Sequence, residues 1–245
     1  MSLAESFFYF IRDIRAKPLF DLLRTHCTNR ARVLDVGGGS FYKSVLARQI
    51  QFGSWISIDP SFNSVEQVPH PGVQLLRGDG ACLDYGADCF DVVLSIQVLE
   101  HVFDPIAMVD EMLRVLRPGG VLIVLVPQTS NLHLLPHHYY NFTPYWVREV
   151  FRRRNQSLLS LQLLGGSWST IASRLFYIVV QSFRFSTTSD RQLHRRSPIF
   201  WFVLPVMLVV VIAFMPIVLI LSLFDLKEEP NNILAVVRKV VSDEH

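Results

Sequence analysis

The amino-acid sequence predicts an α/β fold in which a mostly parallel β-sheet is covered by helices on both faces. Short apolar segments alternate with helical segments through residues 1–165. The strand-like segments are apolar throughout and do not alternate apolar with polar residues. Because a strand that is buried on both faces has no polar side, this pattern is typical of parallel sheets.

The elements are expected in a regular order along the chain. Residues 3–24 carry apolar side chains near helical spacing and predict an amphipathic N-terminal helix. Strands are expected at 32–36, 55–59, 73–76, 90–96, 121–126 and 158–164, with helices at 41–51, 105–117 and from Thr143 onward. The helix at 105–117 ends at Pro118-Gly119-Gly120, because proline stops a helix and glycine permits a left-handed turn.

The composition narrows the class of protein. Of the 245 residues, 50% are hydrophobic and 18% are charged, against roughly 25% charged in a typical soluble domain. These values exclude a disordered chain, a coiled coil and a collagen. The net charge of +2 gives no support to a nucleic-acid partner, and none is expected. The three cysteines show neither a C-x-x-C pair nor zinc spacing, which fits a reducing compartment.

The excess hydrophobicity is concentrated near the C-terminus. Residues 197–224 carry no charge, and from Ile199 to Phe224 only Pro205, Pro216 and Ser222 are not apolar. An apolar run longer than about 18 residues predicts a membrane segment. Arginines precede the run and acidic residues follow it. The positive-inside rule then predicts a membrane-associated protein whose preceding domain is cytoplasmic.

A glycine turn follows the first expected strand. Gly37, Gly38 and Gly39 stand where the chain turns into a helix, and the lack of side chains lets a ligand approach the backbone. Asp59 ends the next strand, where an acid accepts hydrogen bonds from ribose hydroxyls. The turn and the acid together predict a nucleoside-containing cofactor. The dinucleotide fingerprint needs a glycine at position 42, where Tyr42 stands, and this disfavours a nicotinamide dehydrogenase.

The segment Asp35-Val36-Gly37-Gly38-Gly39 resembles the D-x-G-x-G motif of class I S-adenosylmethionine-dependent methyltransferases of the type 11-like group. Three more segments resemble that family's motifs, in its order and spacing, over about residues 30–165: Arg77-Gly78-Asp79-Gly80-Ala81, Phe90–Val102 and Leu113–Gly120. The resemblance implies a Rossmann-like, seven-stranded sheet, S-adenosyl-L-methionine as cofactor, and an enzyme of class EC 2.1.1.-.

The resemblance also implies roles for single residues. Asp35 and the three glycines hold the methionine end of the cofactor, Asp59 holds the ribose, Asp79 and Gly80 lie near the adenine, and Gln97 lines the cofactor pocket. Two alternatives stay open: Asp35 as a simple turn cap, and Gly78-Asp79-Gly80 as a turn without a ligand.

Histidines are the candidates for catalysis. Methyl transfer to a hydroxyl needs a group that takes up the proton, and histidine titrates near neutrality. His101 follows the strand at 90–96, at the sheet edge where open α/β sheets bind ligands. His133 and His138 lie in the loop after the strand at 121–126, which should cover the same edge. No metal is expected, since no Asp, Glu or Cys accompanies the loop histidines, although metal binding stays an alternative.

The stretch from His133 to Pro144 resembles a subgroup linked to bacterial cell-surface polysaccharide or lipid-linked glycan pathways. That subgroup usually reads Asp-Tyr-Tyr-Arg-Phe-Thr, and here His138 replaces its Asp and Asn141 its Arg. The expected acceptor is a hydroxyl of a lipid-linked glycan or another amphipathic molecule, and the expected partners are that substrate and the membrane surface. An isoprenoid, quinone or other small acceptor, or an inactive cofactor-binding or membrane-scaffold protein, are the alternatives.

Residues 232–239 are the candidate for the seventh strand, which the family places antiparallel beside the sixth. If this strand joins the cytoplasmic sheet, both ends of the apolar run lie on the same side of the bilayer. The run then cannot be a single membrane crossing. We expect an insertion that enters the membrane and returns, with Pro205 and Pro216 breaking it into short helices and residues 168–183 adding a second apolar face. The expected parts are an N-terminal helix at 1–30, a core at 31–166, the insertion at 167–229, and the last strand with its tail at 230–245.

Overall fold

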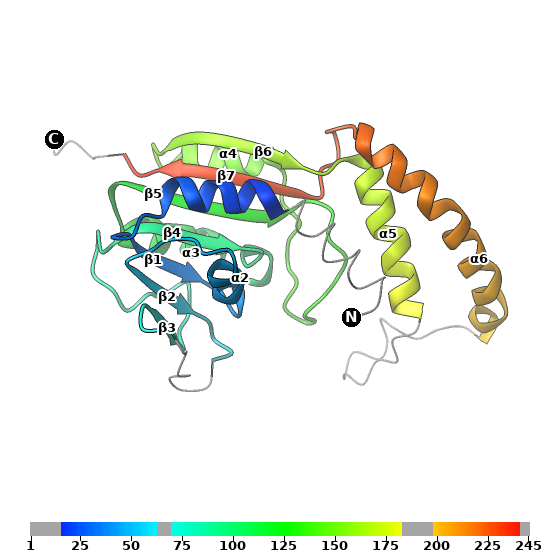
Figure 1. The fold of residues 1–245 in the computed structure, drawn as a ribbon, viewed down its shortest axis with the longest axis horizontal. Helices are drawn as coiled ribbons and strands as arrows, with labels where there is room; N and C mark the ends of the chain where they lie inside the picture. The colour runs from blue at the N-terminus through cyan, green and yellow to red at the C-terminus, as the bar shows by residue number, and fades with distance from the viewer. Residues whose placement is uncertain (1–15, 63–69, 183–197, 241–245) are drawn as a thin grey trace.

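The computed structural model consists of an α/β sheet and a helical hairpin that extends from one end of it (Figure 1). It describes residues 16–62, 70–182 and 198–240. The first half of the expected N-terminal helix lies outside this range, while residues 16–26 are helical.

The sheet confirms the α/β prediction and has the order β3-β2-β1-β4-β5-β7-β6. Its strands are β1 (Arg32–Val36), β2 (Ser54–Ile58), β3 (Val73–Leu76), β4 (Phe90–Ile96), β5 (Leu116–Pro127), β6 (Ser157–Leu164) and β7 (Asn232–Arg238). All pairs among β1 to β5 are parallel, and β7 lies antiparallel between β5 and β6. The last strand of the chain therefore joins the sheet, as expected from the sequence.

The helices of this part are α2 (Phe41–Ala47), the single turn η1 (Leu99–His101), α3 (Pro105–Val115) and α4 (Pro144–Arg152). Both α3 and α4 begin with proline after a capping residue. The Asp104 carboxylate accepts from the backbone nitrogens of Ile106 and Ala107, and the Thr143 hydroxyl accepts from Trp146 N. These caps satisfy backbone donors that the first helical turn leaves free.

The exit from α3 differs from the sequence prediction. The helix ends at Val115, and β5 begins at Leu116, so the Pro118-Gly119-Gly120 segment lies inside the strand. Leu116 is fully buried and pairs with Phe90 of β4, after which the register shifts. Burial of this side chain in the sheet therefore ends the helix before the proline does.

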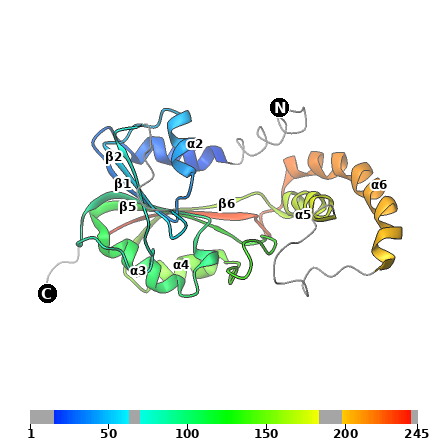
Figure 2. The same cartoon turned by 90° about the horizontal axis from the view of Figure 1, so that it is seen from below.

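The sheet is covered on both faces (Figure 2). The N-terminal helix and α2 lie on one face, and α3 and α4 lie on the other. Successive residues of β5 supply the two cores alternately: Leu122 and Val124 join the α3 side, and Val121 and Ile123 join the α2 side. This explains the unbroken apolar strands, because both faces of the central strands are buried.

The hairpin is built from α5 (Ser167–Ser182), which follows β6, and α6 (Pro198–Leu221), which leads through the turn η2 (Ser222–Phe224) to β7. The expectation that Pro205 and Pro216 break the apolar run is wrong, because α6 is one helix that contains both prolines. Each proline removes a single backbone hydrogen bond, and the helix curves without ending (Figure 2).

Helix α6 is apolar on all sides and mostly exposed. Its buried side chains Leu204, Val211 and Val218 are seven residues apart, so they lie on one face of the helix, and α6 packs against α5. Within Pro198–Phe224, an 18-residue window has a mean hydropathy of 3.1, and 11% of that window is buried, so the helix is long and apolar enough to cross a membrane.

Candidate functional site

The turn between β1 and α2 needs its glycines for two reasons. Gly37 and Gly39 have φ angles of +74° and +46°, which other residues rarely adopt. In addition, the Val98 side chain from the loop after β4 lies directly over Gly37, and the Asp35 carboxylate lies against Gly38. The turn thus packs closely on both neighbouring elements, as expected for a loop whose backbone approaches a ligand.

Of the three glycines in this turn, Gly39 has open space above it. The atom nearest to a side chain built there is Oδ2 of Asp59, at 3.8 Å. Oδ1 of the same carboxylate accepts hydrogen bonds from N and Oγ of Ser61, at 2.9 and 2.5 Å. These bonds orient Asp59 beside the glycine turn, and the arrangement fits a ribose whose hydroxyls donate to the carboxylate.

Asp35 is fully buried below this turn. Its carboxylate, Trp55 Nε1 and Ser57 Oγ are all buried, and none makes a hydrogen bond of good geometry among the described residues. Burial raises the pKa of Asp35 to about 7, the charge of Asp59 adds to this effect, and the polar groups of Trp55 and Ser57 oppose it. Ser57 is the register partner of Asp35 in the parallel pair of β1 and β2. Sequence reasoning missed Trp55 and Ser57, although strand pairing could have indicated Ser57.

Asp79 and Gly80 lie in the turn after β3. Asp79 Oδ1 accepts from Ala81 N at 2.9 Å, so the side chain also stabilises the turn itself. The turn borders a cavity of about 360 Å³, lined by Ile58, Leu76 and Asp79 among others. Its lining also contains Leu83 and Tyr85 and the charged residues Arg77 and Asp84. Apolar side chains beside an acid suit an adenine ring and its amino group, so the cavity fits the base of the expected cofactor.

Gln97 directly follows β4 and has a strained conformation, with a φ of +58°. Its backbone nitrogen donates to Leu125 O at 2.8 Å, and its side-chain Nε2 donates to Asn232 Oδ1 at 3.1 Å. The amide therefore links the end of β4 to the start of β7, across β5. Asn232 is a further residue of this edge that sequence reasoning did not identify.

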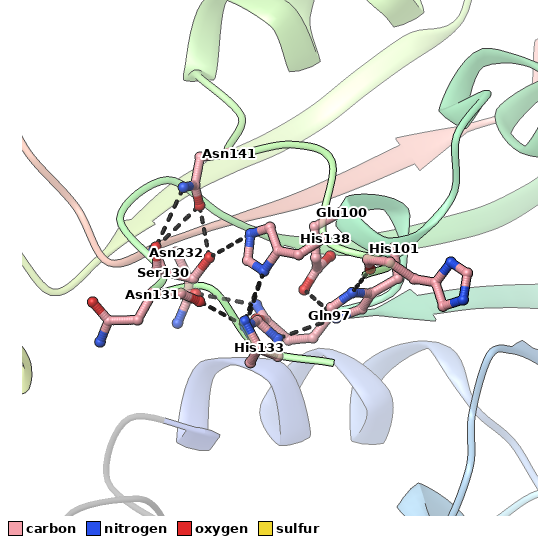
Figure 3. A network of polar contacts seen from close by, with 10 residues as sticks. Gln97, Glu100, His101, Ser130, Asn131, His133, His138, Asn141 and Asn232 are labelled. Atoms are coloured by element: carbon pink, nitrogen blue, oxygen red, sulfur yellow. Dashed lines mark hydrogen bonds and ion pairs between the residues drawn. The ribbon is translucent and has the colours of Figure 1, made fainter. Parts of the chain in front are cut away.

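The three candidate catalytic histidines lie together (Figure 3). His101 Nε2 is 3.1 Å from His133 Nε2, and His133 Nδ1 is 3.1 Å from His138 Nδ1. His101 Nδ1 contacts the carbonyl oxygen of His137 at 2.5 Å, and His133 Nδ1 contacts that of Asn131 at 2.8 Å. The loop after β5 thus folds back over η1, as the sequence predicted. Burial lowers the pKa of both His101 and His138.

Glu100 accompanies this cluster, which the sequence reasoning did not foresee. Its side chain is fully buried, and Oε1 lies 3.8 Å from His101 Nε2. Neither carboxylate oxygen has a hydrogen-bond partner among the described residues, and burial raises the pKa of the group to about 7. The Glu100 carbonyl accepts from Tyr139 N at 2.8 Å, which ties the histidine loop to η1. The premise that no acid accompanies the loop histidines is therefore wrong.

The histidine loop is also bonded to the helical hairpin. The hydroxyl oxygens of Thr129 and Thr170 are 3.2 Å apart, and the Arg174 guanidinium donates to Asn131 Oδ1. Thr170 and Arg174 belong to the first half of α5. The loop over the candidate site and the apolar hairpin therefore share one set of polar contacts.

The fold and this edge define a class of protein. The strand order reverses between β1 and β4, and open α/β sheets bind their ligands at that point, beyond the carboxyl ends of the strands. The glycine turn, Asp59 and the cavity beside Asp79 all lie at this edge, so the class is that of α/β proteins with a nucleoside-cofactor site.

Comparison with known proteins identifies the class more closely. Residues 34–124 match the family described as a methyltransferase domain. A probable S-adenosylmethionine-dependent methyltransferase from Mycolicibacterium smegmatis is 32% identical over 154 residues, which cover 60% of this chain and 56% of the relative. An uncharacterized methyltransferase from Mycobacterium sp. (strain JLS) is 37% identical over 93 residues, 38% of this chain and 37% of the relative. The chain thus spans between about a third and somewhat over half of these relatives.

Solved structures share the fold at low sequence identity. A putative methyltransferase from Bacillus halodurans superposes with a TM-score of 0.58 at 13% identity, covering 92% of this chain and all of the other. A 1,6-didemethyltoxoflavin-N1-methyltransferase from Burkholderia thailandensis, solved with S-adenosylhomocysteine, gives 0.55 at 14% identity, covering 97% and 83%. The family match and the relatives therefore support a class I S-adenosylmethionine-dependent methyltransferase domain around residues 34–124, and the solved structures show the same fold; S-adenosylmethionine is the cofactor of that class.

Proposed function

We propose that the chain transfers the methyl group of S-adenosylmethionine to a hydroxyl of an acceptor held at a membrane surface, a lipid-linked glycan or another amphipathic molecule. The observation that carries the proposal is the bonding between the histidine loop and α5, through Thr129 and Thr170 and through Asn131 and Arg174. An acceptor that arrives along the hairpin reaches the loop over the candidate site.

The residues of the sheet edge have separate tasks in this proposal. When bound, the cofactor supplies an electrophilic methyl group on a sulfonium. Asp59 binds the ribose beside Gly39, while Asp35 orders the turn below it. The cavity beside Asp79 takes the base. Holding these parts in fixed positions orients the methyl group toward the acceptor and accounts for much of the rate enhancement such enzymes need.

The histidine cluster faces the acceptor in this proposal. Removing a hydroxyl proton during methyl transfer is general-base catalysis, which contributes about 10²–10⁴-fold in rate. Neutral histidine nitrogens beside the buried Glu100 carboxylate are suited to receive that proton. The exposed tyrosines Tyr139 and Tyr140 follow the cluster in the same loop and can cover a bound acceptor.

The exposed apolar surface of α6 supports the membrane location. Both ends of the hairpin are attached to the sheet, by β6 and by β7, so the hairpin must enter and leave on one side. The intervening segment 183–197 contains four arginines, Arg184, Arg191, Arg195 and Arg196. Carrying them across a bilayer opposes the positive-inside rule. The hairpin therefore lies in the cytoplasmic interface, where arginines contact anionic lipid.

The acceptor class follows from this location. A protein fixed at a membrane meets membrane-bound acceptors at a raised effective concentration. A lipid-linked glycan offers hydroxyls at the depth of the headgroups, within reach of a domain that sits on the surface. An isoprenoid or quinone acceptor would share the location and is the second candidate.

The test is methyl labelling of membranes. Membranes are incubated with methyl-labelled S-adenosylmethionine, with and without the purified chain, and are separated into lipid, glycan-lipid and protein fractions. We expect label in the glycan-lipid fraction that depends on the protein and that falls strongly in Asp59→Ala when the cofactor concentration is well below saturation. Label in the quinone or isoprenoid fraction would select the second candidate. If the chain binds the cofactor but no fraction gains label when the protein is added, the proposed enzymatic activity is refuted.

A further inference from the structure

We propose that His101, His133 and His138 bind one divalent transition-metal ion, with Zn²⁺ as the expected ion. The inference concerns the cluster at the end of the histidine loop and does not rest on the proposed methyl transfer. A bound ion would occupy the nitrogens to which the proposed function gives the acceptor proton, so the two roles of these histidines are alternatives, and the two tests separate them. The argument depends on which of the two nitrogens in each histidine ring carries the hydrogen. The hydrogen-bond partners of each ring determine this assignment.

The assignment is clear for His101 and His133. A carbonyl oxygen only accepts hydrogen bonds. Nδ1 of His101 therefore donates to His137 O, and Nδ1 of His133 donates to Asn131 O. In the neutral rings both Nε2 atoms are then bare lone pairs, yet they face each other at 3.1 Å. Two lone pairs cannot form a hydrogen bond, so the geometry calls for a cation that both nitrogens can bind.

His138 supplies the third nitrogen. Asn141 Nδ2 donates to Ser130 O, so Asn141 Oδ1 is the acceptor of the Ser130 hydroxyl at 2.7 Å. The hydroxyl proton is thus used, and His138 Nε2, at 3.3 Å, must donate to Ser130 Oγ. Nδ1 of His138 is then an acceptor, and it receives a long hydrogen bond from the backbone nitrogen of His133 at 3.4 Å, which a bound ion would replace.

The spacing suits a metal ion. One ligand atom from each ring lies within 4.8 Å of the other two. A tetrahedral zinc ion with Zn–N bonds of about 2.0–2.1 Å places its ligands roughly 3.3 Å apart. The pair His101–His133, at 3.1 Å, is close to that separation, and the nitrogen of His138, within 4.8 Å of both, must move nearer when the ion binds. Three protein ligands leave the fourth position open for water or an acceptor oxygen.

The surroundings are those of a metal site. Metal-bound histidines usually donate their other ring N–H to a carbonyl, a carboxylate or a polar side chain, which fixes the ring. Here His101 and His133 donate to backbone carbonyls and His138 donates to Ser130. The fully buried Glu100 carboxylate, 3.8 Å from His101 Nε2, supplies negative charge next to a divalent ion.

The test uses the tag-free full chain in detergent after dialysis against a chelator. Zn²⁺ is titrated against a chromophoric competing chelator, and Co²⁺ is added separately to detect the intense visible absorption of tetrahedral coordination. We expect one equivalent of tightly bound Zn²⁺. His133→Ala should lower the affinity at least about 100-fold, since even second-shell changes cost 10–100-fold.

The loop provides a matched control. His137 is exposed, and its ring contacts Tyr139 Oη at 3.0 Å outside the cluster. His137→Ala should keep full affinity, because only the His137 backbone carbonyl contributes to the site. His138→Asn, as a second ligand variant, should behave like His133→Ala, with circular dichroism and S-adenosylmethionine binding reporting that both variants fold.

Three outcomes overturn the proposal: less than one equivalent of Zn²⁺ in the wild type, wild-type affinity in a folded His133→Ala or His138→Asn, or an equal loss in His137→Ala. Because metal binding and methyl labelling are measured separately, a chain without methyltransferase activity can still confirm the site. An active chain that binds no zinc would refute the site alone.

Discussion

In most proteins apolar side chains are buried and polar side chains are exposed. The carboxyl edge of the sheet and the helical hairpin depart from this distribution in opposite ways. The edge buries polar side chains without hydrogen-bond partners among the described residues, including Asp35, Ser57 and Glu100. The hairpin exposes apolar side chains such as Phe202, at 85%. Buried polar groups are normally paired, and large apolar patches are normally covered. Under the proposals above, the first region binds a polar ligand and the second binds lipid.

The largest expected effect tests the hairpin. Phe202→Glu combined with Val209→Lys places two charges on exposed positions of α6. Charges in the apolar part of a membrane cost up to about 2.5–3.5 kcal/mol each, so binding should weaken by on the order of 5 kcal/mol. Flotation with vesicles that contain anionic lipid measures the loss.

Tyr145 provides the control for this comparison. It is 79% exposed on α4, outside the hairpin. Tyr145→Glu should float with the vesicles as the wild type does. A double variant of α6 that still floats would show that the exposed apolar surface of the hairpin does not bind lipid.

The next effect tests the buried edge through its pH dependence. Asp35 has a pKa of about 7 in the folded chain, above its ordinary value of 3.8, because burial disfavours the charged form. The unfolded chain therefore releases this proton near pH 4, and the folded chain holds it until about pH 7. The free energy of unfolding should fall as pH rises across that window, by up to about 4 kcal/mol from this group.

Asp35→Asn should remove that contribution. The variant should gain stability over the wild type at about pH 8 and differ little at about pH 4, as measured by denaturant unfolding at each pH. Asp110→Asn, on the exposed face of α3, should keep the wild-type profile. A stability difference between Asp35→Asn and wild type that is independent of pH would contradict the assignment.

A third prediction makes the same substitution in both regions. Ile123 in β5 is fully buried, whereas Ile212 in α6 is 68% exposed. Ile123→Ala should lower the free energy of unfolding by about 3 kcal/mol, since it removes a buried side chain and leaves a cavity. Ile212→Ala should change it by less than about 0.5 kcal/mol. If both variants lost the same free energy of unfolding in denaturant, the Ile212 side chain would have to be buried, which contradicts its exposure in the structure.

The sequence predicted the glycine turn and the apolar strands because both are local signals. Strand β5 is apolar at every position from Val121 to Pro127, and Gly37 follows β1 directly. The predicted end of α3 was less accurate, because the burial of Leu116 against β4 depends on the folded sheet. The continuity of α6 through Pro205 and Pro216 was missed for a related reason. The local rule that proline breaks a helix does not hold here, because α6 continues past both prolines.

The candidate site was predictable only in its residue types. His101 and His133 were expected at the same edge, but their mutual contact joins positions 32 residues apart and depends on the bond from Tyr139 N to Glu100 O. The hydrogen positions on their rings follow from backbone carbonyls that no sequence motif identifies. The role of Glu100 was hidden for the same reason, since its burial becomes visible only when the loop closes over η1.

The smallest expected effect concerns Asp59, at the polar carboxyl edge of the sheet. Asp59 is oriented by Ser61 and directs its other oxygen toward Gly39. Asp59→Ala should weaken S-adenosylmethionine binding by about 2 kcal/mol, roughly 30-fold, because hydrogen bonds to a charged group contribute about 1.5–3 kcal/mol. Calorimetric titration measures this loss, and Asp110→Asn should bind as the wild type does. Asp59→Asn should fall between the two, since the amide keeps one acceptor oxygen. If Asp59→Ala instead binds with wild-type affinity, the cofactor does not use this carboxylate, and the open space above Gly39 belongs to a different ligand group.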